Sequence, residues 1–270
     1  MRYCVLLAGV LTCLCCSTGL AAQSSLSADQ IMQKSINAYY YAGDDARAHI
    51  SLRLSNKDGR QRLREFTSLR LDSQDGGEQY YYLYFTGPPD VQRMVFLVWK
   101  HIGRDDDRWL YLPAVDLVRR ISASDKYAGF VGSDFTYEDV SGRHSAADTH
   151  SLLREEAING RQAYVLQSTP KDAGDAPFSY RRVWVEKGTF LTIKVEYYDR
   201  HQKPYKVLTV KKVEQVQDIA SITAVEMRNL KTGHVTQLTA SNIAYNIGLG
   251  PNTFQERFLR RPPGKWIKGR

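Results

Sequence analysis

The chain has 270 residues, of which 43% are hydrophobic and 24% are charged, and its formal net charge is +8. This composition is typical of a folded globular protein and excludes a disordered or collagen-like chain. All four cysteines, Cys4, Cys13, Cys15 and Cys16, lie near the N-terminus. A mature protein that begins after them has no disulfide, no thiol nucleophile and no thiolate ligand for a metal.

The N-terminal residues have the organisation of a secretory signal peptide. Arg2 supplies a positive start, and Val5–Cys16 is an apolar run too short to span a bilayer comfortably. Small residues follow up to Ala21 and Ala22, and cleavage after either fits the usual rule. We therefore expect a signal peptide at residues 1–22 and a single domain at residues 23–270. An uncleaved N-terminal anchor is the alternative.

A lipoprotein signal fits less well. The residue before a lipidated cysteine should be Gly, Ala or Ser, whereas Thr12 precedes Cys13 and Cys15 precedes Cys16. We therefore expect a soluble exported protein rather than a lipid-anchored one.

Most of the remaining chain has the period of a β-strand. In residues 46–55 apolar side chains alternate with polar ones, which predicts a half-buried strand. Turns such as Asn159-Gly160 and Thr232-Gly233 separate further runs and predict antiparallel neighbours in a meander. So many strands should curl or close rather than form a flat sheet. The further runs are 63–71, 79–85, 91–99, 108–112, 117–122, 152–157, 161–168, 180–186, 190–198, 205–217, 222–229 and 235–245.

Two segments are predicted to be helical. Ser27 can cap a helix over Ala28–Tyr41, with Asp29 in its first turn. Asn252 or Thr253 can cap a short helix that ends at Leu259. The basic residues 260–270 that follow are expected to form a loose tail.

Three strands are apolar at every position instead of alternating. They are Tyr80–Phe85, Met94–Trp99 and Trp109–Leu112. Two apolar faces in an antiparallel strand indicate that both faces are covered. Plain core packing and a ligand cavity remain as alternatives for one of these faces. Alternation cannot say which set would line a cavity, Met94, Phe96 and Val98 or Val95, Leu97 and Trp99.

Residues 122–150 form the longest stretch without a clear strand period. A long irregular segment in a compact domain is often functional. Gly129 and Gly132 are candidate hinges, around which Phe130, Phe135 and Tyr137 could close over a ligand. In that case the carboxylates of this segment should face solvent or pair with Arg119 or Arg120; they are Asp134, Glu138 and Asp139. The alternative is that the aromatic residues are fixed core and the glycines only make turns.

No cluster carries a recognisable catalytic or metal-binding pattern. The carboxylates of residues 104–108 are interpreted as a solvated hairpin turn, and His144, Asp148 and His150 as a surface loop. The sequence has no Gly-x-Ser-x-Gly motif and no phosphate-binding Gly-rich loop followed by Lys. We therefore expect no catalytic residue, no metal and no cofactor. Basic residues suit an anionic membrane or a lipid head group, or simply a solvated surface, better than nucleic acid.

Several segments together resemble the LolA-like family of outer-membrane lipoprotein-sorting proteins, in the subgroup found beside RND-type exporters. The likeness covers most of the chain after residue 22, and its most specific part is Gly132–Asp139. The other segments are Asp107–Pro113, Val118–Ile121 and Asn252–Leu259.

The resemblance implies a mainly β (α+β) fold with a LolA/LolB-like architecture. This is a curled antiparallel sheet forming an incomplete β-barrel of about 11 strands, with an N-terminal helix and a helical lid over an apolar cavity. It also implies a periplasmic protein of a Gram-negative bacterium that carries a lipid or the acyl chains of a lipoprotein, with an RND-type exporter as a possible partner. A lipid sensor and, less well supported, a hydrolase are the alternatives.

On this interpretation the ligand-binding candidates are the aromatic and apolar residues of the cavity strands and the lid. They are Met94, Phe96, Val98, Trp99, Trp109, Tyr111, Phe130, Phe135 and Tyr137. Arg119 and Arg120 are the candidates for a head-group contact.

Overall fold

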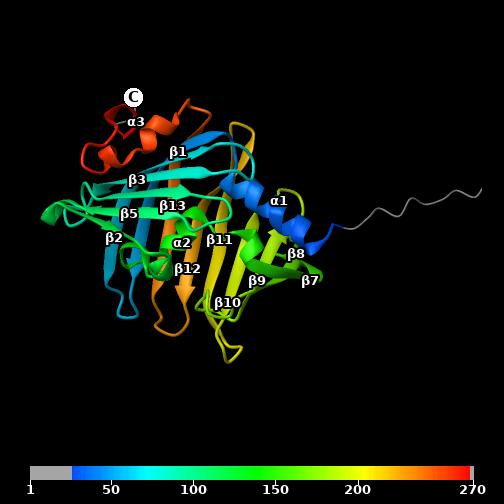
Figure 1. Cartoon of the computed structure of the whole chain (residues 1–270). Helices are drawn as coiled ribbons and strands as arrows, with labels where there is room; N and C mark the ends of the chain where they lie inside the picture. Colours follow the sequence, from blue (N-terminus) through cyan, green and yellow to red (C-terminus); the bar gives the residue numbers. More distant parts are fainter. Residues whose placement is uncertain (1–25, 268–270) are drawn as a thin grey trace, which may run out of the picture.

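The computed structural model describes residues 26–267, which form one large curled antiparallel sheet with a few short helices (Figure 1). The expected signal peptide lies outside these residues. The strands are β1 (Asp45–Ser55), β2 (Gln61–Asp72), β3 (Gln79–Gly87), β4 (Val95–Lys100), β5 (Asp107–Leu112), β6 (Leu117–Arg120), β7 (Asp148–Ile158), β8 (Arg161–Pro170), β9 (Tyr180–Glu186), β10 (Thr192–Tyr198), β11 (Pro204–Val216), β12 (Ile219–Asn229) and β13 (Val235–Tyr245).

The sheet consists of two meanders joined side by side. Its order is β6-β5-β4-β3-β2-β1-β13-β12-β11-β10-β9-β8-β7, and β1 pairs with β13 through contacts such as Leu52 opposite Leu238. Among the described residues β6 and β7 have no partner on their outer sides, so the sheet curls without closing. The predicted curled antiparallel sheet is confirmed. Its 13 strands exceed the number of about 11 that the resemblance implied, but they correspond one by one to the strand-like runs of the sequence, the short run of β6 included.

The predicted N-terminal helix is present as α1 (Ala28–Tyr40), which lies across one face of the sheet (Figure 1). Ser27 caps it as expected and forms a capping box with Gln30, at 3.2 and 2.9 Å. Ile31, Met32 and Ser35 are buried against the sheet, and Ser35 Oγ lies 2.8 Å from Thr192 Oγ1 on β10. No helix among residues 26–267 is both long and apolar enough to cross a membrane.

The fully apolar strands are covered on both faces, as predicted. On the face that carries α1, Phe96 and Val98 belong to a core with Phe66, Phe85 and Phe130. On the opposite face, alternate residues of the same strands belong to a second core under the C-terminal segment. That second set includes Val95, Leu97, Trp109 and Tyr111, which pack against Leu249, Phe254 and Leu259.

Residues 121–147 connect the two meanders and cross the α1 face of the sheet. They contain α2 (Tyr137–Ser141) and three 3-10 turns, at Ala123–Asp125, Phe130–Gly132 and Ser145–Ala147. Thr136 caps α2 through a capping box with Asp139. The backbone N–H of Phe130 donates to the carbonyl of Phe135 at 2.7 Å, which folds the segment into a compact hairpin.

The C-terminal segment differs from the prediction. Residues 251–259 form two 3-10 turns, Pro251–Phe254 and Glu256–Leu259, rather than one helix. Residues 260–267 are not a loose tail, because α3 (Gly264–Ile267) places Trp266 and Ile267 against the second core. Asp45 ties this segment to β1 by accepting hydrogen bonds of 2.8 to 3.0 Å from the backbone N–H groups of Ile247, Gly248 and Leu249.

Candidate functional site

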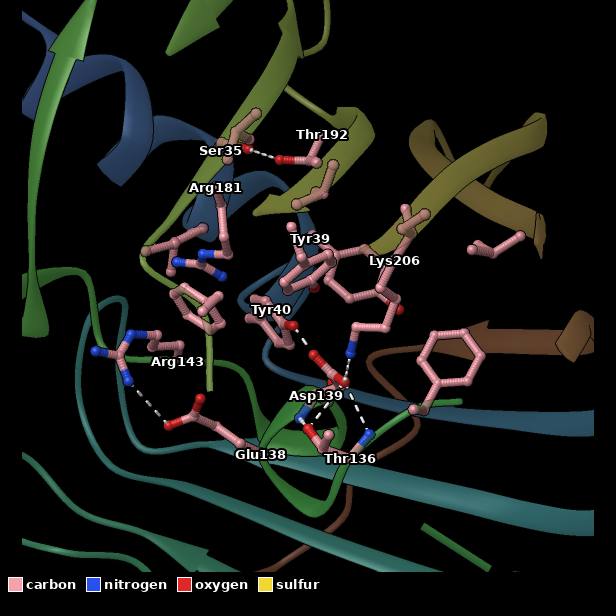
Figure 2. A pocket seen from close by; sticks show the side chains of 18 of the residues that line it. Ser35, Tyr39, Tyr40, Thr136, Glu138, Asp139, Arg143, Arg181, Thr192 and Lys206 are labelled. Atoms are coloured by element: carbon pink, nitrogen blue, oxygen red, sulfur yellow. Dashed lines mark hydrogen bonds and ion pairs between the residues drawn. The ribbon is translucent and has the colours of Figure 1, made fainter. Parts of the chain in front are cut away.

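A cavity of about 170 Å³ lies between α1 and strands β9 to β13, and we call it the apolar cavity (Figure 2). Helix α1 contributes Met32, Ile36, Tyr39 and Tyr40 to its lining. The strands contribute mostly aliphatic and aromatic side chains, because their inward-facing positions alternate with polar outward ones. These are Val183, Val195, Tyr197, Tyr205, Leu208, Val210, Ile222, Val225 and Leu238. Such a lining suits a hydrocarbon chain.

One side of the apolar cavity holds two arginines, Arg143 and Arg181, whose side chains are 4% and 17% exposed. Arg143 Nε donates to Asp148 at 2.8 Å, and Arg181 Nη2 donates to the same carboxylate at 2.6 Å. Arg143 also lies 2.8 Å from Asp175 and 3.6 Å from Glu138. Burial opposes the positive charge of Arg143, but the neighbouring carboxylates outweigh it and raise its pKa. The apolar cavity therefore has a fixed polar side.

The predicted ion pairs across residues 122–150 are wrong. Asp134 accepts from His234 Nδ1 at 2.6 Å, and Asp139 lies 3.6 Å from Lys206 Nζ. Glu138 is buried beside Arg143 and Lys126. Arg119 pairs instead with Asp125 at 3.5 Å, and Arg120 pairs with Asp107. The strand pairing brings His234 and Lys206 to the segment from far along the chain, and Glu138 finds its partners within the segment itself, so Arg119 and Arg120 are not used.

A second cavity, of about 660 Å³, adjoins the first on the other side of residues 141–147. We call it the cationic cavity, because four basic side chains line it against two carboxylates. The basic residues are Lys100, Arg104, Lys126 and Arg143, and the carboxylates are Asp105 and Asp175. A third, smaller cavity of about 170 Å³ lies between α1 and strands β1, β12 and β13. Tyr40 lines all three.

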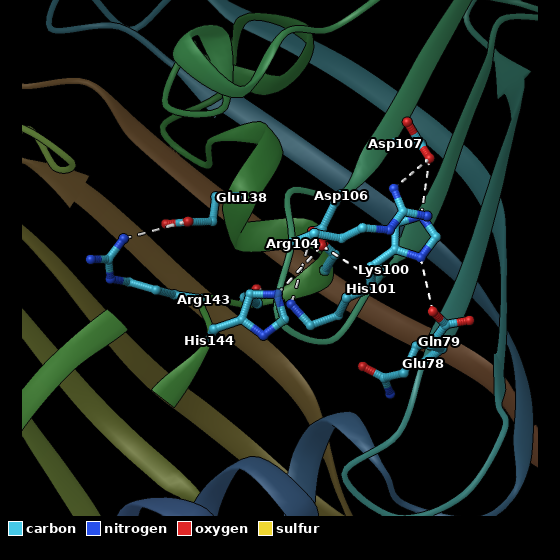
Figure 3. A network of polar contacts seen from close by, with 12 residues as sticks. Glu78, Gln79, Lys100, His101, Arg104, Asp106, Asp107, Glu138, Arg143 and His144 are labelled. Atoms are coloured by element: carbon cyan, nitrogen blue, oxygen red, sulfur yellow. Dashed lines mark hydrogen bonds and ion pairs between the residues drawn. The ribbon is translucent and has the colours of Figure 1, made fainter. Parts of the chain in front are cut away.

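A buried polar network supports the wall of the cationic cavity (Figure 3). Asp106 accepts from Arg108 Nη2 at 2.6 Å and from Ser141 Oγ at 3.3 Å, and its other oxygen lies 3.4 Å from His144 Nε2. The interpretation of residues 104–108 as a solvated turn is therefore wrong for Asp106 and Arg108, which are both buried. Burial lowers the pKa of Lys100 to about 8, although Asp106 at 3.9 Å acts in the opposite direction.

The histidines and carboxylate of residues 144–150 do not converge. His144 faces Asp106, Asp148 lies between two arginines, and His150 Nδ1 lies 2.8 Å from Ser168 Oγ. Within residues 26–267 no three His, Cys, Asp or Glu side chains are grouped to hold a metal ion.

The structure brings only part of the predicted ligand-binding set to the apolar cavity. Phe135 lines it. Five others lie in the adjoining core of the α1 face, namely Met94, Phe96, Val98, Phe130 and Tyr137. Trp99, Trp109 and Tyr111 lie on the opposite face, under the C-terminal segment. Arg119 and Arg120 are exposed on β6 and line none of the three cavities.

The hinge candidates lie within the compact hairpin of residues 129–136. Gly132 has a φ of +80°, which favours glycine, whereas Gly129 has an ordinary negative φ and forms an isolated bridge with Thr136. Phe130 is only 2% exposed, and its ring lies 5.4 Å from that of Phe96. This packing favours the fixed-core alternative for Phe130. Ligand binding by the aromatic set and hinge motion stay predictions.

Sequence reasoning missed the residues of α1 and of the second meander that line the apolar cavity. The run Tyr39-Tyr40-Tyr41 at the end of a helix was a usable signal, because aromatic side chains there must face something apolar. The pair Arg181-Arg182 inside an otherwise apolar strand was a second signal, since a buried arginine needs carboxylate partners.

Comparison with known proteins supports the resemblance. A family model described as an uncharacterized protein matches residues 77–261. The crystal structure of an outer membrane lipoprotein-sorting protein domain from Vibrio parahaemolyticus is similar with a TM-score of 0.79 and 31% identity, over 87% of this chain and 98% of that chain. A DUF1329 family protein from Desulfovibrio piger has the same TM-score at 28% identity, over 87% of this chain and 100% of that one.

A LolA superfamily protein from Nitrosomonas europaea shares the fold with a TM-score of 0.67 at 20% identity, over 87% of this chain and 100% of that chain. Among curated proteins none matches this sequence. The match in Vibrio parahaemolyticus extends over nearly the whole of that domain. The segments that carried the resemblance all lie within residues 77–261, which the family model matches. The chain therefore belongs to the same family as the outer membrane lipoprotein-sorting protein domain of Vibrio parahaemolyticus, and it shares the LolA fold.

Proposed function

We propose that the protein is a periplasmic carrier that binds a lipid, or the acyl chains of a lipidated protein, in the apolar cavity. The observation that carries this proposal is the cavity itself, which has an apolar lining and one wall formed by a single helix. Each buried methylene contributes about 0.8 kcal/mol, so a single acyl chain suffices for useful affinity. The membership of the lipoprotein-sorting family supports the same class of ligand.

The volume of the apolar cavity indicates how a ligand would be accommodated. About 170 Å³ is small for a long chain, since drug-sized ligands occupy sites of about 300–1,000 Å³. Tyr39 separates this cavity from the third one, and Tyr40 separates it from both neighbours. Rotation of these two side chains, together with a shift of the other side chains that line both the apolar and the cationic cavities, would join the three spaces without opening the sheet.

The cellular role that we propose is outer-membrane lipoprotein sorting or lipid export, with an RND-type inner-membrane exporter as a possible partner. Residues 1–22 would be removed as a signal peptide, and residues 23–270 would act as one domain. The proposed carrier transfers its ligand without making or breaking covalent bonds. Release of the ligand therefore needs only a competing binding site or the opening of the cavity. N-terminal sequencing of the exported protein tests the compartment, because an uncleaved or lipidated N-terminus would place it on a membrane.

Ile36 offers a direct test of the binding site. It lies on α1, is only half-buried, and lines both the apolar and the cationic cavities. Ile36→Asp places a charge against the ligand chain, at a half-buried position that borders the core under α1, and should reduce the lipid recovered by about tenfold or more. Asn37→Asp adds the same charge one residue later, lines none of the cavities, and should bind as the unaltered protein does.

The measurement is mass spectrometry of organic extracts of each protein purified from the periplasm. Circular dichroism confirms that each variant is folded. Lipid recovered from the unaltered protein and from Asn37→Asp, but not from Ile36→Asp, would support the proposal. Equal lipid in all three would place the ligand elsewhere, and no lipid in any of them would contradict the carrier function.

A further inference from the structure

The cationic cavity contains donors that the protein leaves unused. Lys100 Nζ donates to the carbonyl of Gly142 at 2.6 Å, and Asp106, the carboxylate paired with it, is 3.9 Å away. An ammonium group has three donors, so Lys100 can give more hydrogen bonds than it makes. Arg143 is 4% exposed, and its Nη2 has no hydrogen-bond partner among the described residues. Both groups can donate to the oxygens of an anion.

The balance of charge in the cationic cavity also favours an anion. Lys126 is paired with Asp175 at 2.6 Å. Arg143 is paired with Asp175 and Asp148, at 2.8 Å each, and only its Nη2 is left without a partner among the described residues. Arg104 extends over the rim, where its side chain is 60% exposed and 3.6 Å from Asp107. The nearby carboxylate of Asp106 is shared with Arg108 and does not line the cavity. Among the residues that line the cavity itself, four are basic and two are acidic, so the lining that an anion would meet carries a formal positive charge.

The two cavities meet at a common wall. Ile36, Tyr40, Arg143, His144 and Ser145 line both of them. The wall consists of side chains and a short 3-10 turn, not of a sheet strand. One molecule with an apolar chain and a compact head could thus occupy both, with its chain beneath α1 and its head beside Lys100.

We infer that the ligand is an anionic amphiphile, and this inference rests on the proposed carrier function. Its acyl chain occupies the apolar cavity. Its head group, a phosphate monoester or a group of similar charge, occupies the cationic cavity and accepts hydrogen bonds from Lys100 and Arg143. The head group therefore determines which amphiphiles the protein selects, since hydrocarbon chains by themselves differ little in chemistry.

The experiment compares two lipids that differ only in charge. Palmitoyl lysophosphatidate and monopalmitoylglycerol carry the same chain, but only the first has a phosphate. Isothermal titration calorimetry of the full mature protein with monomeric lipid gives both affinities. We expect lysophosphatidate to bind at least about tenfold more tightly. Glycerol 3-phosphate, which has the head group without the chain, should bind far more weakly than either lipid.

Two variants then locate the head group. Lys100→Gln and Arg104→Gln should each weaken lysophosphatidate binding by about threefold to tenfold and leave monopalmitoylglycerol unchanged. Arg104 is exposed, so its variant remains informative even if Lys100→Gln is unstable. Arg60→Gln removes the same charge from an exposed turn between β1 and β2 and serves as the matched control.

Each result decides between the two proposals. Equal affinity for the two lipids, or equal effects of the variants on both, would overturn the anionic head group and leave the carrier function intact. Failure of both lipids to bind would overturn the carrier function itself. Glycerol 3-phosphate binding as tightly as lysophosphatidate would identify a site for a free phosphate and would also overturn the inference.

Discussion

Replacement of Asp106 by Asn should be strongly destabilising. The side chain is 2% exposed, and its carboxylate is the counter-charge of Arg108 at 2.6 Å and of Lys100 at 3.9 Å. The amide keeps the shape but removes the negative charge, so two buried cations are left without a carboxylate. Loss of one partner from a buried ion pair costs about 3–5 kcal/mol. We expect a loss of that order in the free energy of unfolding at pH 7.

The pH dependence of the stability should show the contribution of the Asp106 carboxylate. Burial opposes its ionisation, but the hydrogen bond from His144 and the charges of Lys100 and Arg108 outweigh burial and lower its pKa to about 2, from the usual 3.8. A carboxyl whose pKa is lower in the folded state stabilises the fold while it is ionised. At about 1.4 kcal/mol per pKa unit this contribution is about 2 kcal/mol. It is complete above about pH 4 and is lost as the pH falls toward 2.

Urea denaturation, followed by tryptophan fluorescence between pH 7 and pH 3, measures both effects. The unaltered protein should lose stability below about pH 4 more steeply than Asp106→Asn does. Asp105→Asn, at the exposed neighbouring position, removes the same formal charge and should change stability by less than about 0.5 kcal/mol. The reasoning would be refuted if Asp106→Asn were within about 1 kcal/mol of the unaltered protein at pH 7. An unchanged acid dependence in that variant would refute it equally.

Two further substitutions test the covering segments of the sheet. Phe130→Ala should lower the free energy of unfolding by about 3–5 kcal/mol, because the phenylalanine side chain that it removes is only 2% exposed. Phe135→Ala, at the half-buried wall of the apolar cavity, should cost less stability and mainly weaken lipid binding. A stable Phe130→Ala variant would instead indicate a mobile lid. Asp45→Asn should weaken three hydrogen bonds from backbone N–H groups and lower the free energy of unfolding by about 1–3 kcal/mol. It should also make residues 247–267 sensitive to limited proteolysis, whereas Asp44→Asn at the exposed neighbouring position should not. Equal proteolysis of the two variants would show that Asp45 does not hold this segment.

The strands were predictable from the sequence, because side chains in a strand point alternately to its two faces and the burial of each face is visible as a period of two in hydrophobicity. The continuous apolar pattern of Met94–Trp99 correctly indicated that both faces are covered. It could not say by what, since the coverings are residues 121–141 on one face and 247–267 on the other. Neither face of this strand borders the apolar cavity. The alternation of apolar and polar residues shows which face of a strand is buried. Which segment covers that face depends on the topology of the whole chain.

The partners of the charged residues were hidden for the same reason. Asp134 pairs with His234, which is 100 positions away, and Lys206 approaches the backbone carbonyl of Asp134 from β11. These contacts exist only because β1 pairs with β13 and joins the two meanders. No local pattern encodes that pairing, so arginines near in sequence were the natural but wrong partners.

The way α1 is attached bears on how a ligand reaches the cavities. Ile31, Met32 and Ser35 fix the N-terminal half of the helix to the sheet. At the other end, the carbonyl of Tyr40 accepts from Gln79 Nε2 at 2.6 Å and from Arg70, which also donates to Gly43 at 2.7 Å. Detachment of the whole helix would break both sets of contacts.

Ile36 and Tyr39 lie between these two anchors, and together with the side chain of Tyr40 they contribute to the linings of the cavities. Tyr39 is 45% exposed, and the hydroxyl of Tyr40 makes only a long hydrogen bond, 3.5 Å, to the carbonyl of Asp139. Rotation of Tyr39 would break its edge contact with the Tyr40 ring, at 4.7 Å, whereas rotation of Tyr40 would also remove its ring from the core of the α1 face. The helix is thus held at both ends, and its tyrosines lie at the boundaries between the cavities, where a ligand that occupied more than one of them would have to pass.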